Sequence, residues 1–500
     1  MKGKEILIKN NILSGLARIL VSVLLPFILR TVIIRVLGAE YLGLNSLFTS
    51  ILSVLSLAEL GFSNAIIYSM YKPLASNNED AVCSLMLYYK KVYRNIGITL
   101  LGIGFCLTPS ITLFIKGEWP LDINVYLLFL IYLFNISISY FFFAYKSALL
   151  NALQRIDVVN WTQTLVLLLQ YLVQLCVLFI FKNYYIYIIF TPVCTIMCNL
   201  LIARYANKHY PQYQCRGIID QNGKKHIKQK IKGLIIYKIS ETARNSSDTI
   251  VLSTFMGLIT VAVFNNYYYI FCAAYSIMVA INQGIQASVG HSIATESAKK
   301  NFEDLRKYNF GIMWLVSWFT CCLICLYQPF VSLFFGKTML LSTECMILFG
   351  EYFYTLNMNN ARNLYFDGCG LWLEGKYSFL FEAACNLILN VILGKLYGIS
   401  GVIISTIITI FIFNFIWRTI IVFRCYFKES VRLFIRDHFT YFVVTLIVCN
   451  ITYLLCNKVT GGLLYQLIIK LGICTILPNI IMILIYYKKL KNLNIKRIVK

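Results

Sequence analysis

Several charged residues that could bind a ligand lie inside long apolar stretches of this 500-residue chain. In the first such stretch, Arg18 and Arg30 lie on either side of Pro26, which is expected to kink or loosen the helix. Two guanidinium groups on one broken helix suit a phosphate-bearing ligand, because each offers a fixed fork of hydrogen-bond donors. For Arg30 the alternative is a side chain that reaches lipid headgroups beyond the end of the helix. Arg18 lies deeper, which favours a position on a cavity.

A second set of charges recurs at helical spacing later in the chain. Lys238, Glu241, Arg244 and Asp248 fall within about 120° of one helix face, and Asn245 extends its edge. A stripe of alternating sign in an apolar helix predicts a face on a water-filled cavity. The alternative is a buried structural network of Lys238–Glu241 and Arg244–Asp248 pairs. The two interpretations are compatible.

Carboxylates inside apolar stretches could exchange an ion. Glu59, Glu351 and Glu382 each lie within such a stretch, and a buried carboxylate can take up a proton or bind Na⁺. The alternative for each is a pair with a neighbouring Arg or Lys. Glu59 and Glu351, with Glu241 and Asp248 of the charged stripe, are the candidates for coupling to H⁺ or Na⁺.

Signals for enzymatic chemistry are weak. The stretch Gly370-x-x-x-x-Gly375-Lys376 nearly matches a phosphate loop, but Tyr377 stands where Ser or Thr is required. No Ser-His-Asp arrangement and no ATPase domain are visible. We therefore expect that the chain is not an enzyme, and that an ion gradient or the substrate's own gradient supplies the energy for its work.

Cysteine is frequent but gives no recognisable metal motif. The 17 cysteines lie mostly in apolar runs, where they are interpreted as small buried hydrophobic residues. Cys321-Cys322-x-x-Cys325 superficially resembles a metal or redox pair, but it has no His nearby. We expect no metal site and no cofactor. Lys470, isolated in an apolar stretch, has no assigned role.

The composition excludes a soluble enzyme and predicts an all-α polytopic membrane protein. Hydrophobic residues make up 59% of the chain and charged residues 13%, against about 45–50% and about 25% in soluble domains. Continuous apolar runs also exclude the alternating pattern of an outer-membrane barrel. Because each span needs about 20 apolar residues, we predict about 14 transmembrane helices. They lie near 11–36, 41–69, 84–115, 123–150, 159–181, 184–207, 232–256, 260–290, 307–335, 340–366, 374–395, 399–424, 437–456 and 462–487.

Positive charge is distributed unevenly among the connections. The net charge is +24, and Lys and Arg gather in every second connection, whereas the intervening loops hold at most one Lys each. By the positive-inside rule, we expect both termini to face the cytoplasm and the chain to be a multi-pass membrane protein. No nucleic-acid partner is expected, since no aromatic–basic recognition module is visible.

The basic stretch 208–231 is the predicted linker between two lobes. It separates an N-terminal lobe of six helices, 1–207, from a C-terminal lobe of six helices, 232–424. Residues 425–500 then form two additional helices and a basic cytoplasmic tail.

The two lobes show a weak internal repeat. Shifting the sequence by about 219 residues lays 32–51 over 251–270, with Gly38 on Gly257. Each copy predicts a helix that ends in Gly, a very short turn and a second helix. Two copies in one orientation predict a parallel repeat, which is a transporter arrangement. Chance similarity between apolar helices is the alternative.

Two motifs, one in each half of the chain, carry a resemblance to a known family. The first half contains Leu37-Gly38-x-x-Tyr41-Leu42-Gly43-Leu44, then Leu55-Ser56-Leu57-Ala58-Glu59-Leu60-Gly61-Phe62 and Ala65-Ile66. The second half contains Asn245-x-x-Asp248-Thr249-Ile250, then Gly257-x-x-x-Val261-Ala262-x-Phe264-Asn265-Asn266-Tyr267-Tyr268. Both resemble motifs of bacterial polysaccharide transporters, the flippases of lipid-linked O-antigen, capsule or exopolysaccharide units. That family is part of the multidrug/oligosaccharidyl-lipid/polysaccharide exporter superfamily.

The resemblance implies a particular architecture and substrate. It implies two six-helix lobes that form a V, followed by two helices, with a central cationic cavity reached by alternating access. The implied substrate is an undecaprenyl-pyrophosphate-linked oligosaccharide repeat unit, whose pyrophosphate contacts basic residues of the first helix and of cavity-lining helices. Arg18, Arg30 and Arg244 match that role by position, and Lys238 is the fourth basic residue on these helices.

The remaining expectations concern the sugar, the partners and the competing function. Asn266, Tyr267 and Gln283 are the predicted sugar contacts. Membrane lipids and polysaccharide polymerase or assembly proteins are the expected partners. The runner-up is an ion-coupled exporter of organic cations from the same superfamily. The excess of basic over acidic residues on the first and seventh predicted helices disfavours it.

Overall fold

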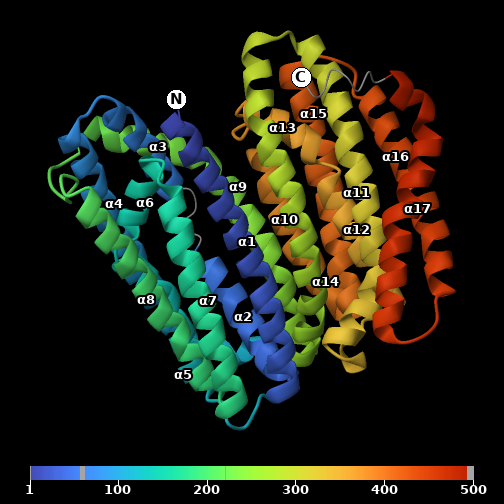
Figure 1. Ribbon diagram of the computed structural model, residues 1–500, viewed down its shortest axis with the longest axis horizontal. Helices are drawn as coiled ribbons and strands as arrows, with labels where there is room; N and C mark the ends of the chain where they lie inside the picture. Colours follow the sequence, from blue (N-terminus) through green and yellow to red (C-terminus); the bar gives the residue numbers. More distant parts are fainter. Residues whose placement is uncertain (1, 57–61, 220, 493–500) are drawn as a thin grey trace. The chain divides into compact units, whose positions relative to one another are not determined.

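The computed structural model describes residues 2–56, 62–219 and 221–492, and within these residues all regular structure is helical (Figure 1). The chain divides into two compact units, Met1–Ala262 and Val263–Lys500. The prediction of an all-α fold is confirmed.

The first unit contains the helices up to α9. They are α1 (Lys2–Val36), α2 (Ala39–Leu55), α3 (Phe62–Ala75), α4 (Glu79–Leu107), the 3₁₀ helix η2 (Thr108–Phe114), α5 (Val125–Phe141), α6 (Ala144–Ala152), α7 (Ile156–Ile180), α8 (Tyr184–His209) and α9 (Gln221–Met256). Within the unit, α1 packs along α7, and α9 packs along α2 and contacts α3. These contacts place α9 in the first unit, while the predicted division at 207, 231 and 424 stays a prediction.

The second unit begins within α10 and contains the rest of the chain. Its helices are α10 (Leu258–Thr295), α11 (Ala298–Phe334), η3 (Lys337–Met339), α12 (Thr343–Asn357), α13 (Asn360–Gly368), α14 (Lys376–Thr409), the π-helix η4 (Ile410–Trp417), α15 (Arg418–Val422), the π-helix η5 (Phe423–Phe427), α16 (Arg432–Asn457) and α17 (Leu463–Asn492). The helices α11, α16 and α17 pack on one another in this unit.

Short polar residues start many of these helices. The side chains of Asn78, Asn124, Asn183, Ser297 and Ser342 each accept a hydrogen bond from the backbone N–H three residues later. Such caps satisfy one of the four N–H groups that have no partner inside the helix. The helix boundaries therefore follow local sequence signals.

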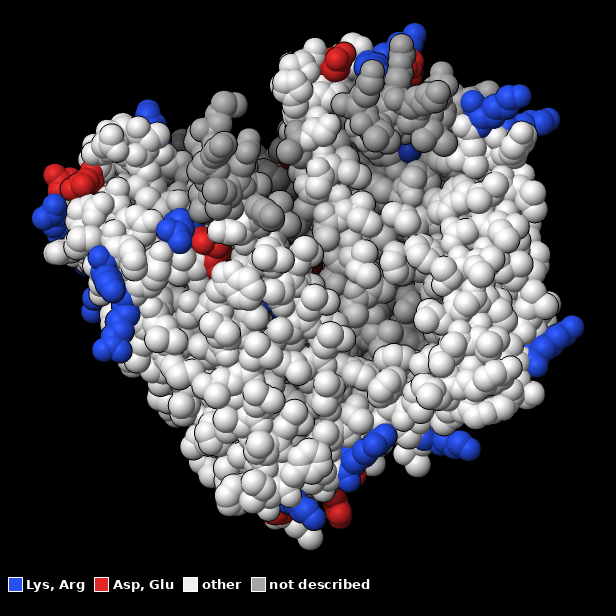
Figure 2. Space-filling view, viewed as in Figure 1, with Lys and Arg blue, Asp and Glu red and all other residues white. Residues whose placement is uncertain are grey.

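Several helices are long and apolar enough to cross a membrane. Among the described residues there are nine, or ten if α5 and α6, which meet at a bend of 50°, form one broken span. Large apolar side chains such as Leu172, Ile388 and Leu484 are exposed on these helices. On the face shown in Figure 2, large areas without charged side chains separate the groups of Lys and Arg. The chain is a multi-pass membrane protein.

The longest apolar segment is a helical hairpin. Residues 376–427 form one continuous run of helix, but Gly398 has a φ of 62°, which interrupts the helical backbone. Across this break, Asn386 donates a hydrogen bond to Thr406 Oγ1 at 3.0 Å, and Ser405 donates to Asn390. The run therefore contains two antiparallel helices, with the turn where the sequence predicts it.

The predicted number of 14 spans is not confirmed by the lengths of the helices. Four short helices, α2, α3, α12 and α13, have 17, 14, 15 and 9 residues. The helix α9 has 36 residues but is too polar to pass as a span by composition. Polar and broken helices of this kind are tolerated in a membrane where other protein segments cover them.

The internal repeat has a counterpart in the structure. Gly38 joins α1 to α2 with a φ of 129°, and Gly257 joins α9 to α10 with a φ of 91°, conformations that favour glycine. The residue ten positions after each glycine is aromatic, and its ring packs on a Phe ring of another helix. Phe48 contacts Phe129 of α5, and Tyr267 contacts Phe349 of α12.

We expect Gly401→Ala to destabilise the α14 hairpin. A Cβ atom at Gly401 would lie 2.0 Å from the carbonyl oxygen of Leu393, and a backbone atom cannot move aside without disturbing the turn. Overpacking of this kind costs about 1–3 kcal/mol. Thermal unfolding of the purified protein in detergent measures the effect. Gly311→Ala is the control, because nothing lies within 4 Å of its Cβ position; equal stability of the two variants would contradict the close approach.

Candidate functional site

Arg18 lies on an accessible face of α1. Its Nη1 donates a hydrogen bond to Asn160 Oδ1 of α7 at 3.3 Å, and Asn160 Nδ2 donates to Ser14 Oγ at 3.3 Å. The Arg18 side chain is exposed, whereas Asn160 and Ser14 are buried. Among the described residues, no carboxylate lies within ion-pair distance of Arg18. A neutral amide therefore orients this guanidinium group without cancelling its charge.

Arg30 lies half-buried near a cluster of tyrosines in the same unit. It interacts electrostatically with Tyr184 and Tyr187 of α8. The hydroxyl groups of Tyr132 and Tyr184 are 2.8 Å apart, and the Tyr41 ring lies 5.3 Å from that of Tyr184. Arg30 thus lies near a cluster of tyrosine hydroxyl groups, and both interpretations of its role stay predictions.

The charged stripe of α9 is partly a structural network. Lys238 Nζ lies 2.6 Å from Glu241 Oε2, so the first predicted pair is confirmed. Arg244 and Asp248 are buried, with 8% and 4% of their surface exposed, and Arg244 Nε donates to Asn245 Oδ1 at 3.4 Å. Because α9 packs on α2 and α3, its polar face is partly enclosed within the first unit.

The predicted sugar contacts lie on α10, in different environments. Asn266 and Tyr267 are fully buried, and Gln283 is exposed. The Tyr267 hydroxyl donates to Gln328 Oε1 at 3.1 Å and accepts from the backbone N–H of Leu341 at 3.1 Å. Tyr267 therefore holds α10 against α11 and the start of α12, and its role as a sugar contact stays a prediction, as do those of Asn266 and Gln283.

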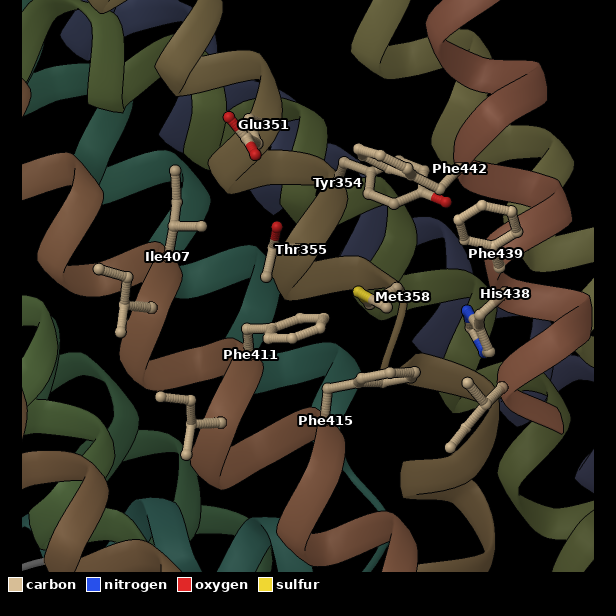
Figure 3. Close-up of a pocket in the computed structure, with 13 residues that line it drawn as sticks. Glu351, Tyr354, Thr355, Met358, Ile407, Phe411, Phe415, His438, Phe439 and Phe442 are labelled. Atoms are coloured by element: carbon tan, nitrogen blue, oxygen red, sulfur yellow. The ribbon is translucent and has the colours of Figure 1, made fainter. Parts of the chain in front are cut away.

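Glu351 lies at one end of an apolar pocket in the second unit (Figure 3). The pocket has a volume of about 690 Å³ and lies between α12, the α14–η4 segment and α16. Aromatic rings, among them Phe411 and Phe442, form part of its wall beside aliphatic side chains such as Ile407. His438, at the other end, lies 3.0 Å from the Asn309 side chain. One carboxylate on an apolar wall can bind a proton or hold the charged end of an amphiphile.

The other predicted carboxylates have different outcomes. Glu59 lies outside the described residues. Glu382 is buried and pairs with Arg418, whose Nε also donates to Ser378 Oγ at 3.1 Å and whose guanidinium lies 4.0 Å from the Phe379 ring. The pairing alternative is thus confirmed for Glu382, and this carboxylate is part of the core of the second unit.

The structure also shows a buried basic residue among amides. Arg362 of α13 is fully buried and donates to Asn359 Oδ1 at 2.8 Å. It also donates to both the side chain and the backbone carbonyl of Asn414 in η4, at 2.7 Å and 3.0 Å. Together with the Asn386–Thr406 and Asn390–Ser405 bonds, these contacts form a polar core. In the sequence, the spacing of Asn386 and Asn390, four residues apart in an apolar helix, indicates a polar strip on one face of that helix.

Comparisons with known proteins identify the fold. No family model matches the chain, and no curated protein matches its sequence. Among solved structures, the lipid II flippase MurJ in an inward-closed conformation superposes with a TM-score of 0.72 at 15% identity, covering 96% of this chain and 100% of that one. An inward-facing multidrug resistance MATE family transporter of the MOP superfamily gives 0.59 at 13%, covering 79% and 93%. A MATE structure in the bent conformation gives 0.55 at 13%, covering 84% and 98%. The chain has the fold of these transporters.

We expect Arg418→Met to destabilise the second unit strongly, because it leaves Glu382 buried without its counter-charge. Removing one member of a buried ion pair costs about 3–5 kcal/mol. The double variant Glu382→Leu/Arg418→Met should recover much of the loss, since no isolated charge remains. Thermal unfolding measures both variants. As a control, Arg216→Met removes an exposed arginine that lies 3.4 Å from Asp80, a pair worth about 0–1 kcal/mol. A double variant as unstable as the single one would contradict this account.

Proposed function

We propose that the chain is a flippase that moves undecaprenyl-pyrophosphate-linked oligosaccharide repeat units across the cytoplasmic membrane. The carrying observation is the structural likeness to a lipid II flippase over 96% of this chain and the whole of the other. Lipid II is the lipid for which that other flippase is named, and we do not assign it to this chain. The extension to polysaccharide repeat units rests on the resemblance of the sequence motifs.

The chemistry of the first unit supports an anionic headgroup. Arg18 presents an accessible guanidinium without a carboxylate partner among the described residues, and Asn160 fixes its direction. A guanidinium binds phosphate oxygens through two parallel hydrogen bonds. Arg30 and Arg244 belong to the same unit, and Lys238, whose charge Glu241 offsets, is the weakest of the four proposed pyrophosphate contacts.

The proposed transport cycle is an electrostatic switch. Uncompensated positive charge favours a conformation that keeps the basic groups in water, and a bound pyrophosphate neutralises them. The ligand then shifts the population toward the other conformation by its difference in affinity for the two. No covalent bond is made or broken, so the proposed activity is not enzymatic. Glu59, Glu241, Asp248 and Glu351 remain candidates for H⁺ or Na⁺ coupling.

Export of organic cations is the second candidate. It is favoured by the likeness to MATE transporters and by the pocket in which Glu351 accompanies aromatic rings (Figure 3). A carboxylate beside aromatic faces attracts a cation both by charge and by cation–π interaction. The exposed, uncompensated Arg18 argues for the anionic substrate instead.

We expect Arg18→Ala and Arg244→Ala to reduce flipping of a fluorescent undecaprenyl-pyrophosphate-oligosaccharide in proteoliposomes by about 10–100-fold each. The estimate follows from a charge-assisted hydrogen bond of about 1.5–3 kcal/mol. Asn160→Ala should cause a smaller loss, because Arg18 keeps its charge and loses only the hydrogen bond that orients it. Arg216→Ala, which removes an exposed arginine in the 210–219 loop, should leave flipping unchanged. Thermal unfolding excludes misfolded variants, in particular for the buried Arg244.

The competing function predicts a different pattern in the same vesicles. Export of ethidium that depends on Glu351 and survives Arg18→Ala, with no flipping of the lipid-linked oligosaccharide under any ion gradient, would overturn the flippase proposal in favour of the cation exporter.

A further inference from the structure

Cysteines from three helices of the second unit meet in its interior. Cys325 of α11, Cys456 of α16 and Cys474 of α17 have Sγ atoms that all lie within 4.8 Å of one another. All three are buried, with exposed fractions of 4%, 1% and 0%. The three helices pack on one another in pairs, and in Figure 1 they lie next to one another. The cluster is therefore a product of the tertiary fold, formed by residues far apart in the sequence.

One of the sulfur–sulfur distances matches that of a metal–thiolate site. Two sulfur atoms bound to one Zn²⁺ at about 2.3 Å lie roughly 3.8–4.0 Å apart at tetrahedral to trigonal angles. The Sγ atoms of Cys456 and Cys474 are 3.9 Å apart. The same distance is almost twice the bond length of about 2.05 Å in a disulfide. The spacing thus fits two ligands of a common ion better than a covalent bond.

A fourth cysteine lies next to the three. Cys321 is one helical turn before Cys325 on α11, so both side chains lie on the same face of the helix. It is fully buried. Structural zinc sites are closed and four-coordinate, and Cys₄ is one of their common ligand sets. The three clustered cysteines and Cys321 on the adjoining turn therefore offer the four sulfur atoms that one ion would need.

Lys470 provides the second, independent observation. It lies on α17, one turn before Cys474, has only 9% of its surface exposed, and interacts electrostatically with Cys456. Among the described residues no carboxylate lies within ion-pair distance of it. An isolated ammonium group is expensive inside an apolar helix bundle. It lies one turn from Cys474 on the same face of α17, where its charge can offset part of the negative charge of metal-bound thiolates.

Lys470 would reduce the net charge of a zinc–thiolate site. A cysteine that coordinates Zn²⁺ is deprotonated, so four thiolates contribute −4, Zn²⁺ contributes +2 and Lys470 contributes +1. Lys470 thus lowers the net charge of a Cys₄ site from −2 to −1. We propose that Cys325, Cys456 and Cys474, completed by Cys321 and partly balanced by Lys470, form a structural Zn²⁺ site that joins α11 to the α16–α17 pair.

One ligand lies close to the end of its helix. Cys456 is the penultimate residue of α16, and the following residues, Lys458–Gly462, form an exposed connection to α17. Because binding of Zn²⁺ releases thiol protons, the affinity for Zn²⁺ falls as the pH is lowered.

The test is metal retention by the full-length protein purified in detergent with a thiol-free reductant. After equilibration with Zn²⁺ and gel filtration, elemental analysis should find about one equivalent of zinc per chain. Cd²⁺, used as a spectroscopic probe, should give the ultraviolet charge-transfer absorption of a thiolate complex. Both signals should be lost in Cys325→Ser/Cys456→Ser/Cys474→Ser and strongly reduced in Lys470→Met, whereas Lys470→Arg should retain them.

Cys194→Ser is the matched control, because it replaces a buried cysteine of α8, in the first unit. It should bind zinc like the wild type, and Zn²⁺ should raise the unfolding temperature of both but not that of the triple variant. The triple variant with Ala in place of Ser separates loss of metal from the burial of new hydroxyl groups. Zinc retention equal in wild type and triple variant, or a Cys456–Cys474 disulfide in wild-type protein purified without reductant, would overturn the proposal.

Discussion

The buried ion pair between Arg418 and Glu382 shows the constraint under which the whole structure is built. In an apolar environment each polar group must find its partner inside the protein, because no water is available to replace it. Arg418 meets this requirement with a carboxylate, a hydroxyl and an aromatic face. Arg362 meets it in part, because its Nη2 donates to two amide oxygens and a backbone carbonyl. Most apolar contacts of these helices are exchangeable with lipid contacts, so the polar bonds carry a large share of the specificity of packing.

The same constraint sets Arg18 apart from the buried ionisable groups of both units. In the second unit, Arg362, Arg418 and Glu382 are enclosed, and in the first unit Arg244 and Asp248 are buried as well. Arg18 is exposed, and its guanidinium donates to a neutral amide. A charged group that stays accessible inside an apolar helix is unusual, and this contrast is why Arg18 carries more of the functional argument than the deeper-lying residues.

Local signals made much of the fold predictable, and long-range packing accounts for what was missed. The turn near Gly398, the glycine junctions at Gly38 and Gly257 and the Lys238–Glu241 pair follow from patterns within a few residues. The enclosure of Tyr267 does not, because its partners Gln328 and Leu341 come from other segments. The contact of Cys325 with Cys456 and Cys474 cannot be predicted from the sequence either, because the three residues lie on three different helices.

The π-helical segments η4 and η5 give the C-terminal half of the α14 hairpin an adjustable register. A π-helical turn holds one more residue than an α-helical turn, so returning η4 to α-helix would rotate everything after it by about 100°. Asn414 lies inside η4 and Arg418 directly follows it. Such a rotation would turn Arg418 away from Glu382 while leaving the first half of the hairpin in place. The ion pair between Arg418 and Glu382 therefore stabilises the π-helical register of this segment over the α-helical one.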